Sequence, residues 1–118
     1  MSQLQQEMQE LELGIEEAKK MIERSNALRR LMANADFKTI IDDDYLREEA
    51  IRLSHLLGSP HVQLKAAQED ILNDLKGIAS LKRYFHTLLT MGNQAEEAIL
   101  AHEEALEELR QSDEEVGG

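Results

Sequence analysis

The residues that could support chemistry are concentrated in one short stretch, TIIDDDYLREEA at residues 39–50. Three consecutive aspartates, Asp42, Asp43 and Asp44, are followed there by Glu48 and Glu49. Clustered carboxylates are the groups that bind divalent cations or act as general acids and bases. Consecutive residues on a helix point about 100° apart, however, so the aspartates would splay around the axis. Neither the calcium-loop spacing D-x-D-x-D-G nor the zinc pattern H-E-x-x-H occurs. We therefore expect these aspartates to cap and stabilise a helical turn at a kink, without a metal.

The four histidines, His55, His61, His86 and His102, are the other candidates for acid–base chemistry near neutral pH. His55 and His61 flank a predicted turn, but two imidazoles without a positioned acidic partner are a weak zinc signal. His102 falls in a helical seam, where a polar residue commonly sets the register. No nucleophile elbow, P-loop or dinucleotide fingerprint is present. We expect no catalytic residue, no metal and no cofactor, and we expect that the protein is not an enzyme.

Composition predicts the elements that would carry these residues. Of 118 residues, 31% are charged, one is proline and none is cysteine. Strong helix formers dominate and β-branched residues are sparse, which predicts an all-α fold. The absence of cysteine excludes disulfides and thiolate-ligated zinc. No apolar run approaches the roughly 20 residues that span a bilayer, and the first thirty residues are charged throughout, so we expect no membrane segment and no signal peptide.

The net charge of −11 is concentrated at the C-terminal end. Residues 92–118 hold nine acidic residues against Arg110 alone. No basic stripe is long enough to neutralise many phosphates, so we expect no direct nucleic-acid binding. The predicted acidic face consists of glutamates that recur in pairs beside the apolar stripe, namely Glu96, Glu97, Glu103, Glu104, Glu107 and Glu108.

Hydrophobic spacing predicts three helices, at about residues 3–33, 36–57 and 60–111, in a single domain of residues 1–111. The first helix carries a heptad seam, and a second heptad phase runs from Leu64 to Leu109. Gly58, Ser59 and Pro60 predict a tight turn, with Gly58 in the left-handed conformation. Gly92 and Asn93 are also typical of a helix end, so a break at 91–93 is the alternative to one long helix. Residues 112–118 are expected to be a disordered acidic tail.

These helices predict an up–down–up arrangement, an antiparallel hairpin or three-helix array with a long, coiled-coil-like C-terminal helix. The middle helix spans roughly 33 Å and the last roughly 75 Å. The second half of the last helix would then lack a partner within the chain, and monomers rarely expose so long an apolar strip. We therefore expect a homo-oligomer. The predicted interface consists of seam residues on the first and last helices, namely Leu4, Met8, Leu11, Ile15, Leu81, Phe85, Leu88, Ala95, Ile99, His102, Leu106 and Leu109.

Two segments, ANADFKTIIDDDYLREEAIRLSHLLGSP and IASLKRYFHTLLTMGNQAEEAI, resemble small acidic helical proteins of tailed bacteriophages. The shared features are an N-x-DF-K opening, a Y-x-x-EEA-x-RL helix and a later L-x-x-YF segment. The matching positions are Asn34, Asp36, Phe37, Lys38, Tyr45, Glu48, Glu49, Ala50, Arg52, Leu53, Leu81, Tyr84 and Phe85. The resemblance covers about two thirds of the chain and brings no catalytic residues. It implies a viral origin and a role in particle assembly or in countering the host.

Two hypotheses follow. The first is a non-enzymatic, self-associating helical protein of the bacteriophage virion or of its assembly, located in the host cytoplasm or in the virion. The alternative is a small acidic inhibitor or nucleic-acid mimic that binds the basic surface of a host or phage nucleic-acid enzyme. Under either hypothesis another phage or host protein can be a partner.

Overall fold

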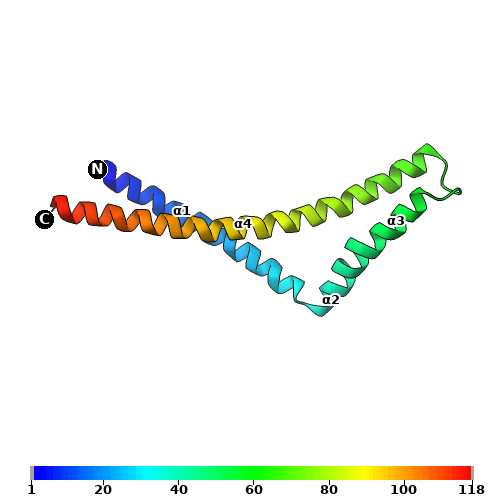
Figure 1. The fold of residues 1–118 in the computed structure, drawn as a ribbon, viewed down its shortest axis with the longest axis horizontal. Helices are drawn as coiled ribbons and strands as arrows, with labels where there is room; N and C mark the ends of the chain where they lie inside the picture. The colour runs from blue at the N-terminus through cyan, green and yellow to red at the C-terminus, as the bar shows by residue number, and fades with distance from the viewer. Residues whose placement is uncertain (1, 118) are drawn as a thin grey trace. The chain divides into compact units, whose positions relative to one another are not determined.

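A computed structural model describes residues 2–117, and within this range the chain forms helices and turns without any strand (Figure 1). The elements are α1 (Gln3–Met32), α2 (Ala35–Phe37), η1 (Lys38–Glu49), α3 (Ala50–Leu57) and α4 (Lys65–Gly117). The predicted all-α class with a long C-terminal helix is therefore confirmed.

The break after α1 is explained by local capping. Arg29 and Arg30 lie in the last turn of α1, where positive charge favours the carbonyl end of a helix. Asn34 then has extended backbone angles, and its side-chain oxygen accepts the backbone N–H of Phe37 at 3.0 Å. Asn34 therefore acts as the N-cap of the next helical stretch, a role that asparagine fills well.

The aspartate triplet does not lie where the sequence predicted. Asp42–Asp44 fall in the middle of η1, a π-helix of 12 residues, and they cap no helix. The prediction of a cap is wrong because Asn34 starts this helical stretch eight residues earlier, and the chain continues without a kink-terminated turn into α3. π-Helices are rare and mostly a single turn long, so residue preferences gave no indication of this one.

The connection between α3 and α4 is longer than predicted. α3 ends at Leu57 as expected, but Gly58 has φ −87° and ψ 0°, which is not the left-handed conformation. Backbone bonds from Ser59 to Leu56 and from Val62 to Ser59 form turns, so the last helix begins at Lys65 instead of residue 60.

α4 continues from Lys65 through Gly92 to Gly117, which is 53 residues or about 80 Å of helix. The break considered at 91–93 is absent. Residues 112–117, which were expected to be a disordered tail, belong to α4, and residue 118 lies outside the described residues.

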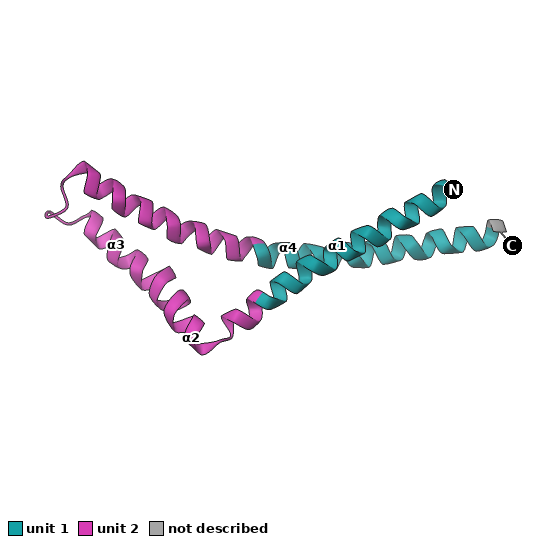
Figure 2. Cartoon of the chain, turned by 180° about the vertical axis from the view of Figure 1, so that it is seen from behind, with its two compact units in different colours: residues 1–27, 88–118 teal, residues 28–87 magenta. Residues whose placement is uncertain are grey.

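The chain divides into two compact units, both of which contain part of α4 (Figure 2). Unit 1 consists of residues 1–27 and 88–118, and unit 2 consists of residues 28–87. In unit 2, Leu46 and Leu53 pack against Ile78 to form a small core, which Phe85 and other half-buried apolar residues extend. The Phe37 and Phe85 rings lie 6.0 Å apart between centroids. Unit 2 is thus a helix pair, with η1–α3 on one side and the first half of α4 on the other.

Candidate functional site

Unit 1 is formed by α1 and the second half of α4, which lie side by side and antiparallel (Figure 2). Gly14 of α1 lies against His102 of α4, and Ser25 lies against Gly92, so the residue numbers rise on one helix as they fall on the other. Ala18, Ala95 and Leu106 are buried in this seam. The expectation that the second half of the last helix has no partner in its own chain is therefore wrong, because α1 covers it.

The two helices approach each other closely at Gly92. A Cβ built on Gly92 would overlap both Oγ and Cβ of Ser25. Ser25 is fully buried, and its hydroxyl donates to the Ile22 carbonyl at 3.0 Å, so the polar atom is satisfied within its own helix. Gly92 does not end the helix. Glycine is needed here because the opposing side chain occupies the space of its Cβ.

Gly14 makes the reciprocal contact. A Cβ on Gly14 would lie 2.6 Å from Nε2 of His102. The Nδ1 atom of His102 lies 2.5 Å from the Ala98 carbonyl, and because a carbonyl only accepts, Nδ1 donates this bond. His102 is thereby oriented by its own helix, and its ring rests on the bare backbone of α1. The signal that could have found both contacts was a glycine in or beside each heptad seam.

The predicted interface residues divide between the two units. Leu81 and Phe85 pack on the core of unit 2. In unit 1, Ala95 and Leu106 are buried and the remaining members are half-buried. All of them therefore contribute to helix pairing within the chain, and the half-buried ones retain some accessible surface. Those half-buried members in unit 1 are Leu4, Met8, Leu11, Ile15, Leu88, Ile99, His102 and Leu109.

An open groove of about 590 Å³ follows the seam of unit 1. Its apolar floor consists of Leu11, Ala105 and Leu109, which are half-buried. Its walls carry carboxylates from both helices, with exposed Glu7 and Glu10 on α1 and exposed Glu108 on α4, and His102 and Ser112 complete the lining. A floor of this kind suits apolar side chains, and the walls suit cationic ones. This groove is therefore a candidate site for a partner with both kinds of side chain.

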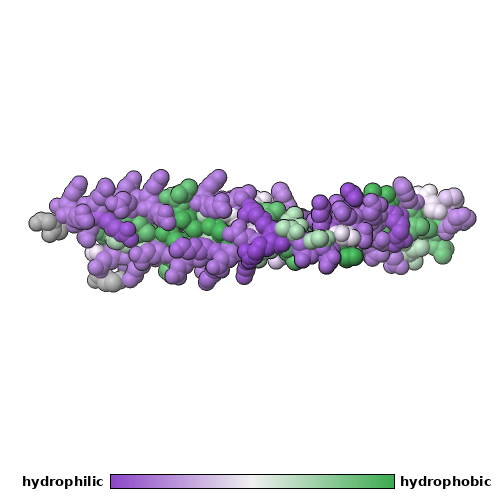
Figure 3. Space-filling view, turned by 90° about the horizontal axis from the view of Figure 1, so that it is seen from below, coloured by the Kyte–Doolittle hydropathy of each residue, from purple (hydrophilic) through white to green (hydrophobic). Residues whose placement is uncertain are grey.

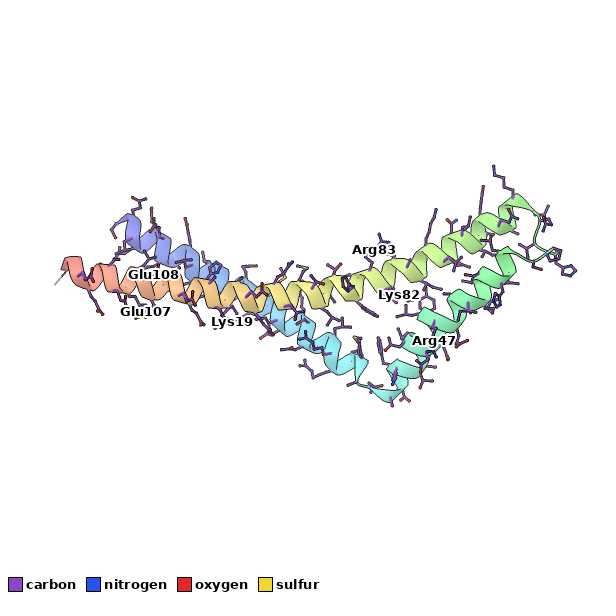
Figure 4. The ribbon with its side chains drawn as sticks, viewed as in Figure 1. Lys19, Arg47, Lys82, Arg83, Glu107 and Glu108 are labelled. Atoms are coloured by element: carbon purple, nitrogen blue, oxygen red, sulfur yellow. The ribbon has the colours of Figure 1, made fainter. Side chains whose placement is uncertain are left out.

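The predicted acidic face is solvent-exposed throughout: Glu96, Glu97, Glu103, Glu104, Glu107 and Glu108 are all exposed. Figure 4 shows that neighbouring members of the face differ in direction, because Glu108 lies on the side of α4 nearer to α1 and Glu107 on the other side. Only Glu108 of this set lines the groove.

The two units differ sharply in charge. Unit 1 holds fifteen acidic residues against four basic ones, whereas unit 2 holds nine of each. The whole net charge of −11 therefore belongs to unit 1, and unit 2 is neutral.

Exposed apolar side chains show the opposite distribution. Among the residues whose side chains the structure describes, nine large hydrophobic ones are exposed, and of these only Leu13 and Leu100 belong to unit 1. Hydrophobic side chains reach the surface between rows of hydrophilic ones in the face drawn in Figure 3. The seven in unit 2 are Leu31, Ile40, Tyr45, Ile51, Leu64, Leu72 and Tyr84.

The carboxylate-rich stretch at residues 39–50 forms ion pairs with neighbouring arginines. Asp43 lies 3.8 Å from Arg47, and Glu49 accepts from Nε of Arg52 at 2.9 Å and from a second guanidinium nitrogen. The hydrogen bond from Arg52 lowers the pKa of the Glu49 carboxyl below its usual value. His55, His61 and His86 are exposed. Among the described residues, no three histidine, aspartate or glutamate side chains are grouped so that they could hold a metal ion.

Comparisons with protein-family models, with curated proteins and with solved structures found no match to this chain. No helix among the described residues is long and apolar enough to cross a membrane.

Proposed function

We propose that this chain is a non-enzymatic helical protein that self-associates and acts through protein–protein contacts in bacteriophage assembly or in the virion. The observation that carries the proposal is the set of seven exposed large hydrophobic side chains on the neutral unit 2. Association through this unit does not bring two net charges together, so electrostatic repulsion is smallest where apolar surface is greatest.

The thickness of each unit also favours a partner. Each unit is only two helices thick, and two helices cannot enclose each other's apolar faces. Contact with another chain would bury part of this surface.

The bacteriophage part of the proposal depends on the resemblance of residues 33–60 and 78–99 to small acidic phage proteins. That resemblance supports a place in particle assembly, where repeated contacts between copies are needed. Mass spectrometry of purified virions tests it. The protein should be found there at more than trace level, and its absence from both virions and assembly intermediates would contradict the phage assignment.

Exposed apolar residues of unit 2 can be tested directly for self-association. Replacing Leu72, Ile51 and Tyr84 together by Gln, Gln and Ser removes exposed apolar surface of unit 2 without touching its buried core. We expect the association constant measured by sedimentation equilibrium to fall at least tenfold, because about 25 cal/mol of stabilisation is lost for each Å² of apolar surface no longer buried.

The matched control replaces Leu13 and Leu100 of unit 1 by Gln, since these two leucines are 62% and 63% exposed. The control should associate like the wild type. Equal effects of the two sets of substitutions would argue against unit 2 as the associating surface.

The charge distribution favours a second candidate function, an acidic inhibitor of a basic protein. Unit 1 gathers the net charge of −11 and presents carboxylates on both walls of its groove. A complex with a nucleic-acid enzyme that dissociates between about 0.1 and 0.5 M salt would support this candidate, since exposed ion pairs are screened at high ionic strength.

A further inference from the structure

We infer that copies of this chain associate head to tail: the outer face of α4 in unit 2 of one copy occupies the acidic groove in unit 1 of the next. This inference rests on the proposed self-association and names the two surfaces that make it.

The receiving surface is the groove of unit 1. Leu11 and Leu109 lie on its floor, and carboxylates rise from both helices, Glu10 on one wall and Glu108 on the other. A helix that carries apolar residues along one line and cations beside them would fill such a groove, in the helix-in-groove manner of many peptide complexes.

Unit 2 supplies a helix face of this kind. Leu72, Lys76, Ala79 and Arg83 are spaced by four, three and four residues, which places them on one side of α4. All four are exposed, and Leu72 is 42% exposed, so this side points away from the core around Ile78. In Figure 4, Arg83 lies on the side of α4 that faces away from η1–α3. We call these four residues the cationic face.

The cations of this face are free to bind. Within the part of the chain that the structure describes, neither Lys76 nor Arg83 forms an ion pair, whereas Lys65 lies 4.0 Å from Glu69. Lys76 and Arg83 are seven residues apart, or about 10 Å along the helix. Two cations at this separation can meet carboxylates on both walls of one groove.

The two surfaces also match in length. On α4 the groove extends from His102 to Ser112, which is about 15 Å of helix. The cationic face extends from Leu72 to Arg83, which is about 16 Å. Contact between the unit 1 of one copy and the unit 1 of another is disfavoured, because each carries a net charge of −11. Contact between unit 1 of one copy and the neutral unit 2 of another does not meet this repulsion.

A contact between unlike surfaces has a consequence for assembly. Each copy in a head-to-tail pair keeps one free groove and one free cationic face, so further copies can add until a ring closes or a filament forms. One helix in one groove buries less than the roughly 1,200 Å² of a stable complex, so each contact is weak and assembly requires high local concentration.

Paired charge reversals test the inference. The groove variant carries Glu10→Lys and Glu108→Lys, and the face variant carries Lys76→Glu and Arg83→Glu. Sedimentation of each variant alone should show association at least tenfold weaker than that of the wild type. An equimolar mixture of the two should recover association like that of the wild type, because the intact face then meets the intact groove and the reversed face meets the reversed groove.

A control variant with Glu12→Lys and Glu107→Lys makes the same change in net charge at exposed glutamates outside the groove. It should associate at least as well as the wild type. Circular dichroism identifies any variant that has lost helix, and all the substituted side chains are exposed, so the fold should be retained.

The outcomes separate this inference from the proposed function. If the wild type associates and the groove variant behaves like the control, the head-to-tail contact is overturned while self-association stands. If the wild type stays at one chain, both fail. If the wild type stays at one chain and a basic amphipathic peptide binds the groove in a manner that Glu10→Lys and Glu108→Lys abolish, the occupant is another protein, and the second-copy inference is overturned.

Discussion

Gly14 and Gly92 determine how closely α1 and α4 approach in unit 1. Each glycine faces a polar side chain from the opposing helix, His102 in one case and Ser25 in the other. The two contacts are separated by 11 residues on α1 and by 10 on α4. Sliding one helix by a single turn would put a side chain against a side chain at both places. These contacts therefore fix the register of α1 against α4. The leucines and alanines of the seam alone would permit several registers.

Substitution of these glycines should separate packing from helix propensity. Gly92→Ala gains about 1 kcal/mol of helix propensity but forces the helices apart at Ser25, which typically costs more. We expect a net decrease of about 1 kcal/mol or more in the free energy of unfolding in urea. Gly77→Ala is the control, because a Cβ there meets only the Tyr45 hydroxyl at 3.9 Å. It should raise the free energy of unfolding by about 1 kcal/mol.

The double variant Ser25→Gly/Gly92→Ala identifies the cause. Moving the small residue to the other helix restores space for one Cβ, so the double variant should be more stable than the sum of its single effects predicts. Strict additivity would show that Ser25 and Gly92 are not coupled.

The Glu49–Arg52 ion pair predicts a pH dependence of stability. The hydrogen bond from Arg52 lowers the folded-state pKa of Glu49, so the pair stabilises the fold above the unfolded-state pKa and is lost as the pH falls through the folded one. The melting temperatures of the wild type and Glu49→Gln should therefore differ at pH 7 and converge as the pH falls well below 4.5. Because the pair is solvent-exposed, 1 M salt at pH 7 should also reduce the difference. A difference that is the same at pH 7 and pH 2.5 would contradict this role.

At the scale of the elements, the sequence predicted where helices end better than it predicted which helices pack against each other. The gap predicted between residues 33 and 36 and the helix end predicted at residue 57 are breaks that the structure has, because capping and chain termination depend on neighbouring residues. The heptad seams of α1 and α4 showed which faces are buried, but such a pattern does not say which helix covers which. The prediction left half of α4 uncovered for that reason.

Other features of the elements could not be read from local pattern. The close contacts at Gly14 and Gly92 could not be predicted, because the side chain that fills each gap comes from a residue nearly 90 or 70 positions away. The π-helix at Lys38–Glu49 has no residue signature. The groove was missed as a site although Leu11, His102 and Leu109 had been placed in the seam, since an opening beside a seam depends on the separation of the two helices.

The N-cap at Asn34 is the element boundary most open to test. Asn34→Ala removes the acceptor for the Phe37 N–H and should lower the free energy of unfolding by about 1 kcal/mol. Asn34→Asp keeps an acceptor and should be close to the wild type. Hydrogen exchange at the Phe37 amide should accelerate in the alanine variant only; unchanged protection there would mean that the cap does not hold this end.

At the scale of the whole molecule, charge and exposed apolar surface are divided between the two units. Unit 1 carries the net charge and an acid-walled groove, whereas unit 2 is neutral and carries seven of the nine large hydrophobic residues that are exposed in the described part of the chain. This division suits a protein whose two units contact different surfaces. It also replaces our original reason for expecting an oligomer, since α1 covers the strip on α4 that seemed to need a second chain.

The central claim is self-association, and sedimentation equilibrium of the wild-type chain from about 5 to 500 µM tests it most directly. The account predicts an average mass that rises above 13.4 kDa with concentration, because each single contact is small and weak. A mass that remains at 13.4 kDa over the whole range, at both low and moderate salt, would contradict it.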